Sequence, residues 1–216
     1  MARRPRRVSG PRWRRRKDDR PAEIISAAVV TFAERGYAAT RLDDVAARAG
    51  VSRATVYLYF RSKEDLFKAV VRQLIVPLVE GKSSVDASPT SSADLLRRFI
   101  GSVPEAIEST GLAVIPKLVI AESNNFPELA RFYFKEVPSR ARRTIAALVR
   151  RGIERGEFAA VDPDHAFFCI VAPIFMTVMW RHVFGPFDKD APDLDAVCRT
   201  HLEILMRGLQ KPGSPR

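Results

Sequence analysis

The 216-residue sequence has little cysteine and none of the short motifs that mark common catalytic or metal sites. Cys169 and Cys198 lie in apolar stretches without CxxC or Cys/His spacing, which predicts reduced, buried thiols; a redox-sensing pair is the alternative. The three histidines lack HExxH spacing, and no Gly-rich phosphate loop or GxSxG elbow occurs. We therefore expect no catalytic activity, no metal ion and no cofactor.

Long hydrophobic runs are also missing. The most apolar stretch, residues 166–180, is fifteen residues long and contains Pro173, whereas a membrane helix needs about 20 residues. The basic start MARRPRR is not followed by the apolar segment of a signal peptide. These features predict a cytoplasmic protein in which 166–180 is a doubly buried core helix.

Positive charge is concentrated at one end of the chain. The formal net charge is +11, and residues 1–20 contain ten Arg or Lys and two Asp, so they supply +8 and leave +3 for the rest. These twenty residues lack periodicity and are rich in Arg, Pro and Gly, which predicts a disordered basic arm.

Beyond the arm, apolar residues recur with the period of an α-helix, and no stretch alternates with period two, so the predicted fold class is all-α. Pro77 is expected to bend or end the helix at 62–80. Pro138 is expected to kink the helix at 127–155, and Gly152 and Gly156 mark the fraying end of that helix. The expected helices run from Pro21 to about Gly36, over a short segment after Thr40, from Ser52 to Phe60, and over 62–80, 93–109, 112–123, 127–155, 163–184 and 193–209.

Local signals define the first helices and the domain limits. Gly36 suits a left-handed cap, Thr40 and Asp43 have capping-box spacing, and Ser52 is a good N-cap. Residues 81–92 are rich in Ser, Pro, Asp and Thr and predict a loop. The expected parts are an arm (1–20), a helix-turn-helix domain (21–68), a helical domain (69–211) and a tail (212–216).

The third expected helix, within GVSRATVYLYF at 50–60, has an unusual outer face. Val56 and Phe60 are four residues apart and can be buried together. Ala54, Thr55 and Leu58 then point outward with Tyr57 and Tyr59 on the flanks, which is poor surface chemistry for a solitary soluble protein. Two short helices joined by a Gly-containing turn describe a helix-turn-helix.

Residues 22–67 resemble the DNA-binding domain of the TetR family of bacterial repressors. Ala54 departs from the pattern, because many relatives have Gly there; its side chain prevents the closest backbone approach but keeps the helix. The matching positions are Phe32, Gly36, Tyr37, Thr40, Val45, Ala46, Gly50, Val51, Ser52, Tyr57, Phe60, Lys63, Leu66 and Phe67.

The resemblance implies that the third helix lies in the major groove of double-stranded DNA. Ala54, Thr55 and Leu58 would face base edges, and Arg53 would reach a guanine or a phosphate. The hydroxyl groups of Tyr57 and Tyr59 would bind phosphates. The remaining expected phosphate contacts are Thr40, Arg41, Ser52 and Lys63. The basic arm is either a solvated tail or a further DNA contact along phosphates or in a minor groove.

The C-terminal two-thirds is less specific. Members of the family use this region to bind a small molecule and to dimerise, and residues 119–138 resemble a large subgroup with diverse or unknown effectors. Apolar residues cover more than one face of the expected helix at 163–184 and form a stripe along the one at 193–209. This predicts a four-helix bundle with a second copy; simple core helices are the alternative. The expected dimer residues are Phe167, Ile170, Ile174, Leu194, Val197, His201, Ile204 and Leu205.

An effector cavity is expected among the helices at 93–184, although aromatic and Met residues at helical spacing are more often plain core. The expected lining is Phe99, Ile115, Leu118, Glu122, Phe132, Phe175, Met176, Met179 and Trp180. The resulting hypothesis is a homodimeric repressor of a palindromic operator that an unknown small hydrophobic effector releases. The alternative is a DNA-binding protein without such a gate, switched by a protein partner or acting architecturally.

Overall fold

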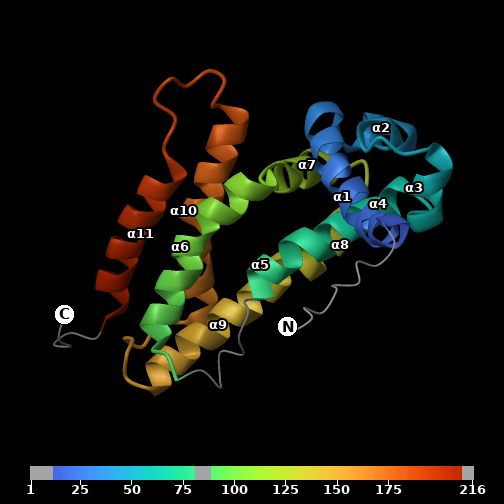
Figure 1. The fold of residues 1–216 in the computed structure, drawn as a ribbon. Helices are drawn as coiled ribbons and strands as arrows, with labels where there is room; N and C mark the ends of the chain where they lie inside the picture. The colour runs from blue at the N-terminus through green and yellow to red at the C-terminus, as the bar shows by residue number, and fades with distance from the viewer. Residues whose placement is uncertain (1–11, 81–88, 211–216) are drawn as a thin grey trace, which may run out of the picture. The chain divides into compact units, whose positions relative to one another are not determined.

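The computed structural model describes residues 12–80 and 89–210, and within them every regular element is helical (Figure 1). One isolated antiparallel bridge joins Phe158 and Gln210. The all-α prediction is therefore confirmed. The elements are α1 (Arg12–Ala39), α2 (Leu42–Arg48), α3 (Arg53–Tyr59), α4 (Lys63–Val70), η1 (Val71–Ile75), α5 (Val76–Glu80), α6 (Ser92–Thr110), α7 (Val114–Glu122), α8 (Pro127–Glu136), α9 (Pro138–Glu154), α10 (Pro163–Val183) and α11 (Leu194–Leu209).

The chain divides into two compact units, Met1–Val70 and Val71–Arg216. In the first unit, α1 packs against α2 and α4, and α2 packs against α3. Its centre is an aromatic cluster in which the ring of Phe32 lies 5.8 Å from Tyr37 and 6.0 Å from Phe67. All three side chains are buried, so this small core holds α4 against α1.

Helix α1 differs from the expectation at both ends. It begins at Arg12, not at Pro21, so residues 12–20 are helical, while the rest of the predicted disordered arm, 1–11, lies outside the described residues. The segment before Pro21 is mainly Arg and Lys, which favour helix, and a proline removes only one bond of the ladder. At the other end Gly36 has φ 74° and ψ 172°, an extended conformation with positive φ that replaces the predicted left-handed cap.

The predicted helix at 62–80 is present, but its middle is wound differently. Residues Val71–Ile75 form a π-helical turn between α4 and α5, and Pro77 follows within α5. Proline has no N–H and its ring crowds the carbonyl four residues earlier. A wider preceding turn accommodates this ring, so Pro77 alters the helix without ending it, and the helix continues to Glu80.

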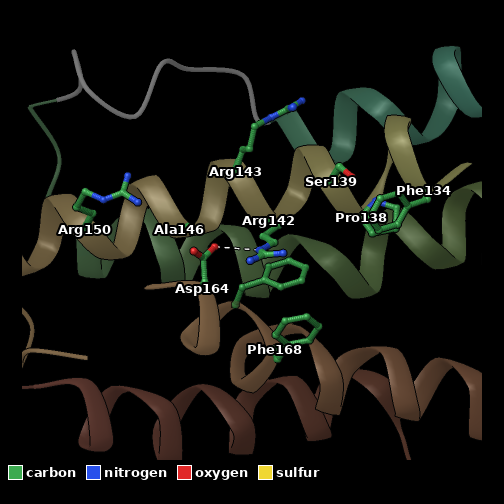
Figure 2. A pocket seen from close by; sticks show the side chains of 10 residues that line it. Phe134, Pro138, Ser139, Arg142, Arg143, Ala146, Arg150, Asp164 and Phe168 are labelled. Carbon is green, nitrogen blue, oxygen red and sulfur yellow. Dashed lines mark hydrogen bonds and ion pairs between the residues drawn. The ribbon is translucent and has the colours of Figure 1, made fainter. Parts of the chain in front are cut away.

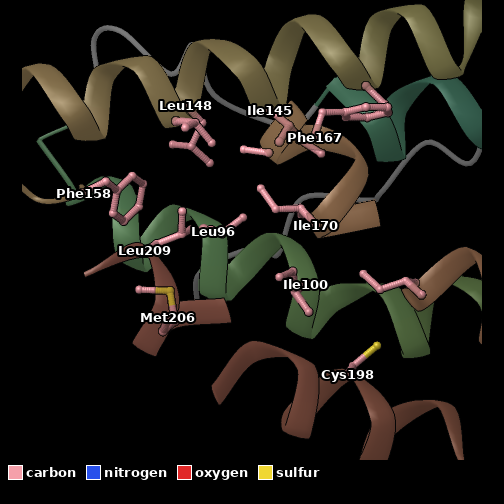
Figure 3. Packing of buried hydrophobic residues seen from close by; sticks show 14 of the residues in the cluster. Leu96, Ile100, Ile145, Leu148, Phe158, Phe167, Ile170, Cys198, Met206 and Leu209 are labelled. Atoms are coloured by element: carbon pink, nitrogen blue, oxygen red, sulfur yellow. The ribbon is translucent and has the colours of Figure 1, made fainter. Parts of the chain in front are cut away.

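The second unit is built around α6, α9, α10 and α11, whose buried side chains form one apolar cluster (Figure 3). Leu96 and Ile100 come from α6, Ile145 and Leu148 from α9, and Ile170 from α10. Met206 and Leu209 of α11 and the fully buried Phe158 close the cluster at one end (Figure 3). Within the same unit, α5 and α8 pack against α9, and α7 packs against α10.

The predicted helix at 127–155 is two helices. Val137 has φ −114° and ψ −75°, and α9 starts at Pro138, which breaks the ladder more completely than the predicted kink. Gly152 was predicted to mark a fraying end, but it is buried against Phe158. A Cβ added to Gly152 would lie 2.1 Å from Cδ2 of that ring. Gly152 therefore serves close packing, and only Gly156, with φ 72°, marks the end.

Helix α10 is buried on one face only, contrary to the prediction of a doubly buried helix. Ile170, Ile174 and Val178 face the core, while Phe168 and Met176 are exposed. By length and composition alone α10 could cross a membrane, with a mean hydropathy of 1.6, but the core helix of a soluble protein passes the same test.

The two cysteines differ in burial. Cys198 of α11 is buried as predicted, and burial raises the pKa of its thiol; Cys169 is exposed, so that part of the prediction is wrong.

Candidate functional site

A tight turn sets the angle between α2 and α3. Gly50 has φ 63°, which favours glycine, and the N–H of Val51 donates to the carbonyl of Ala46 at 3.0 Å. Ser52 then caps α3, because its hydroxyl accepts the N–H of Thr55 at 3.1 Å. The predicted helix-turn-helix and its Ser52 cap are therefore confirmed.

Helix α3 has one buried face and one bare face, as its sequence predicts. Val56 is fully buried and Phe60 nearly so. Leu58 is 72% exposed and Tyr57 43% exposed, and both are large apolar groups in water. Ala54 is also exposed, and Thr55 and Tyr59 are half-buried. The outer face of α3 therefore offers a leucine, a hydroxyl and an aromatic ring on a short, well-anchored helix.

Arg53 is held against this face by a partner that the sequence did not reveal. Its Nε lies 3.0 Å from Oδ1 of Asp43 in α2, and its guanidinium stands 5.3 Å from the centre of the Tyr57 ring. A hydrogen bond with Tyr57, and then the charge of Asp43, raise the pKa of Arg53. All three groups are exposed or nearly so, so the pair orients Arg53 without removing it from solvent.

Thr40 and Arg41 take part in the hydrogen bonding at the start of α2. Thr40 is only 2% exposed, and its hydroxyl donates to the carbonyl of Gly36 at 2.6 Å. Helix α2 is capped one residue later: Arg41 is the N-cap and its N–H donates to Oδ2 of Asp44 at 3.0 Å. The capping box predicted for Thr40 and Asp43 is therefore wrong. Arg41 stays exposed, while the Thr40 hydroxyl is occupied inside the fold.

Lys63 also turns toward its own chain. Its Nζ donates to the carbonyls of Tyr37 at 2.6 Å and Ala38 at 2.8 Å, and it lies 4.6 Å from the centre of the Tyr37 ring. These carbonyls follow the kink at Gly36, so the ammonium stabilises the last turn of α1. Spacing alone placed Lys63 at a helix N-terminus but could not show the carbonyls opposite it.

The residues predicted to line an effector cavity do not form the pocket described in the second unit. That pocket, of about 530 Å³, lies along α8, α9 and α10 and is lined by other residues, among them Phe134, Arg142 and Phe168 (Figure 2). The nine predicted residues differ in solvent exposure. Ile115 and Leu118 are buried, Phe99, Glu122, Phe132 and Met179 are half-buried, and Phe175, Met176 and Trp180 are exposed.

The predicted dimer residues divide in the same way. Four of them are core residues of their own chain: Phe167, Ile170, Ile174 and Leu194 are buried. Val197, His201 and Leu205 are half-buried, with His201 Nε2 2.9 Å from the carbonyl of Ile170, and Ile204 is 66% exposed. The sequence could not orient α10, because it is apolar all round. Its exposed apolar residues are Phe168, Phe175, Met176, Trp180 and Val183.

Comparison with known proteins agrees with these features. A family model described as bacterial regulatory proteins, tetR family, matches residues 24–70, and one described as AefR-like transcriptional repressor, C-terminal domain, matches residues 94–207. The chain is 27% identical to the HTH-type transcriptional repressor KstR2 of Rhodococcus jostii (strain RHA1) over 198 residues, covering 91% of this chain and 94% of the relative.

A second relative, the HTH-type transcriptional regulator YfiR of Bacillus subtilis (strain 168), is 30% identical over 202 residues, covering 90% of this chain and 94% of the relative. Among solved structures, the transcriptional regulator FadR from Bacillus subtilis in complex with stearoyl-CoA is similar with a TM-score of 0.71 and 26% identity. That similarity covers 87% of this chain and 98% of FadR.

Proposed function

Because the chain belongs to the TetR family of bacterial transcriptional regulators and is a transcriptional repressor of that family, we propose that it binds a palindromic operator as a homodimer and is released by a small-molecule effector. The observation that carries the DNA-binding part is the bare face of α3. Leu58 and Tyr57 are exposed on a helix that Ser52, Val56 and Phe60 hold firmly in place.

The chemistry of that face suits the major groove of DNA. Leu58 can contact a thymine methyl, and the hydroxyl of Thr55 can donate to or accept from a base edge. Tyr57 and Tyr59 supply hydroxyls for phosphates, and Arg53 and Arg41 supply cations for phosphate or guanine. We leave the hydroxyl of Thr40 out of this set because it is buried and already bonded.

Dimerisation is supported by the outer face of α10. Phe175 and Met176 are exposed next to one another on it, and Ile204 of α11 is exposed as well. Such apolar groups on two adjacent helices suit packing against a second copy, which also supplies the second recognition helix for a palindrome. The dimer surface proposed is therefore this exposed set, together with the half-buried Val197, His201 and Leu205.

The effector part is supported by one relative and by one pocket. FadR, a relative of similar fold, was solved with stearoyl-CoA, and the second unit of this chain also has a pocket. The helix formed by α4, η1 and α5 runs across the boundary between the units, so it is the element through which an effector would change the operator spacing. An effector acts in this way only by binding the two states with different affinity.

The alternative is a DNA-binding protein of the bacterial cytoplasm without a small-molecule gate. One observation favours it: the apolar cluster of the second unit is packed, and the residues expected to line an internal cavity do not line the α8–α10 pocket. A compound that raises the thermal midpoint of the protein and also releases it from its duplex favours the gated repressor. If no compound that stabilises the protein changes DNA affinity, the ungated reading replaces it.

The decisive experiment combines duplex selection with a dimer variant. The purified full chain is expected to select a palindromic duplex from a random library and to sediment as a dimer. Met176→Glu should fold, because the side chain is 59% exposed, yet sediment as a monomer and lose most operator affinity. Val30→Glu, at an exposed apolar site in α1, is the matched control and should leave the mass unchanged. A wild-type chain that is monomeric or selects no duplex refutes the proposal.

A further inference from the structure

The pocket of the second unit is a groove along one side of α9. Arg142, Ala146 and Arg150 are spaced four residues apart on that helix, and Ala146 is buried between the two arginines. Phe134 of α8 lies at one end beside Pro138, and Asp164 and Phe168 of α10 lie along the side (Figure 2). A small residue between longer ones keeps the groove open, and its volume of about 530 Å³ is in the range of small-molecule sites.

The groove has an excess of positive charge. Three arginines line it, Arg142, Arg143 and Arg150, against one carboxylate, Asp164. Asp164 is committed to Arg142, whose Nε lies 2.9 Å from its Oδ1. Within residues 12–80 and 89–210, neither Arg143 nor Arg150 has an ion-pair partner. Guanidinium groups present paired N–H donors that match phosphate and carboxylate oxygens, so the unpaired arginines suit an anion.

Two aromatic side chains of the remaining lining are uncovered. Phe134 is 63% exposed and Phe168 57% exposed, although each is a large aromatic group. Phe168 is steadied by the buried Phe167, whose ring centre lies 5.2 Å away in an edge-on arrangement. Two bare phenylalanines at the rim of a charged groove favour a ligand that has an apolar part as well as an anionic one.

We infer that this groove binds an anionic amphiphile, with a phosphate or carboxylate group near Arg143 and Arg150 and an alkyl or ring-containing body against Phe134 and Phe168. The twelve-residue rise along α9 from Pro138 to Arg150 is roughly 18 Å, so the ligand is elongated. This inference rests on the proposed function in one respect: the ligand is the class of effector that the gated repressor would recognise. Its binding, however, is measured on the protein alone.

Calorimetry on the full chain tests the site with four probes below their micelle concentrations: decyl phosphate, decanoate, 1-decanol and inorganic phosphate. At least one of the two charged alkyl probes should bind at least tenfold more tightly than decanol and than inorganic phosphate. Preference for decyl phosphate identifies a phosphate ligand, preference for decanoate a carboxylate ligand, and equal binding a site that accepts both. Inorganic phosphate binding as tightly as decyl phosphate overturns the amphiphile and leaves a plain anion site.

Two sets of variants locate the binding. Arg143→Gln with Arg150→Gln changes exposed residues and should weaken the charged probes about tenfold or more while leaving decanol binding unchanged. Arg131→Gln, an exposed arginine of α8 outside the groove, is the matched control and should change nothing. Equal weakening by both sets overturns the site. A double variant that changes the sedimenting mass instead shows that a second copy covers the groove, and also overturns it.

Failure of this site and failure of the gated repressor are distinguishable. If the alkyl probe binds the groove but leaves the affinity for the selected duplex unchanged, the site stands and the gate is refuted for this ligand class. If the alkyl probes do not bind and another compound releases DNA, the gated repressor stands and the groove is overturned.

Discussion

Leu58 allows the DNA-binding interface to be tested separately from the fold. Complete burial of a leucine side chain is worth about 1.5–3 kcal/mol, and 72% of this one is exposed. If the duplex covers that exposed part, Leu58→Ala should cost about 1–2 kcal/mol of binding free energy, or roughly 5- to 30-fold in affinity. The free energy of unfolding should change by no more than about 0.5 kcal/mol, because the side chain contributes little to the core.

The assay is fluorescence anisotropy with the duplex that the full chain selects, repeated with duplexes in which single thymines are replaced by uracil, which lacks only the methyl group. Loss of the thymine methyl at the contacted step should have no further effect on Leu58→Ala, although it weakens the wild type. Val56→Ala is the matched control on the opposite face of α3. Val56 is fully buried, so this change should lower the free energy of unfolding by about 1.5 kcal/mol or more. Unchanged affinity in Leu58→Ala, or equal loss on random DNA, refutes direct reading by this face.

Three further predictions concern packing and phosphate contacts. Gly152→Ala should destabilise the chain by about 1–3 kcal/mol, because the added Cβ would collide with the buried ring of Phe158. Gly101→Ala, which has open space around it, is the control and should stabilise the chain by up to ~1 kcal/mol. Thermal unfolding that gives the two variants the same change in stability would contradict this prediction. Tyr57→Phe should weaken binding about equally on all duplexes, whereas a base-dependent loss would make Tyr57 a reading residue. Deleting residues 1–17 should flatten the salt dependence by about 0.9 log unit per lost phosphate contact, and an unchanged slope leaves the arm without a role on DNA.

The architecture was predictable where a residue acts through its neighbours in the chain. The helices, the turn at Gly50 and the cap at Ser52 depend on local periodicity and local hydrogen bonds, which the order of residues contains. The bare face of α3 followed from the burial of Val56 and Phe60 four residues apart. The break before Pro138 was expected as a kink because proline always disrupts the ladder, but its extent depends on how α8 packs.

The contacts that the sequence did not reveal join residues that are distant in the chain. Lys63 donates hydrogen bonds to carbonyls 25 and 26 residues earlier, and the residues around Lys63 in the sequence give no sign of these contacts. The pairing of Asp43 with Arg53 across the turn was not predictable either, because the turn and not the local sequence brings them together. Helix α10 is apolar all round, so its sequence does not say which side faces the chain's own core. The arginine groove was missed because its apolar half comes from two helices and its charged half from a third.

The contact between Asp43 and Arg53 makes docking an exchange reaction. In the free protein the carboxylate of Asp43 engages Nε of Arg53, so a phosphate or guanine that binds the guanidinium through Nε must displace Asp43. A carboxylate left beside the sugar-phosphate backbone repels it, which penalises loosely placed complexes more than a well-registered one. Removing the acid, as in Asp43→Asn, would therefore strengthen binding to random duplexes more than binding to the selected one. Asp43 therefore acts as an intramolecular competitor that raises the sequence specificity of DNA binding and lowers its affinity.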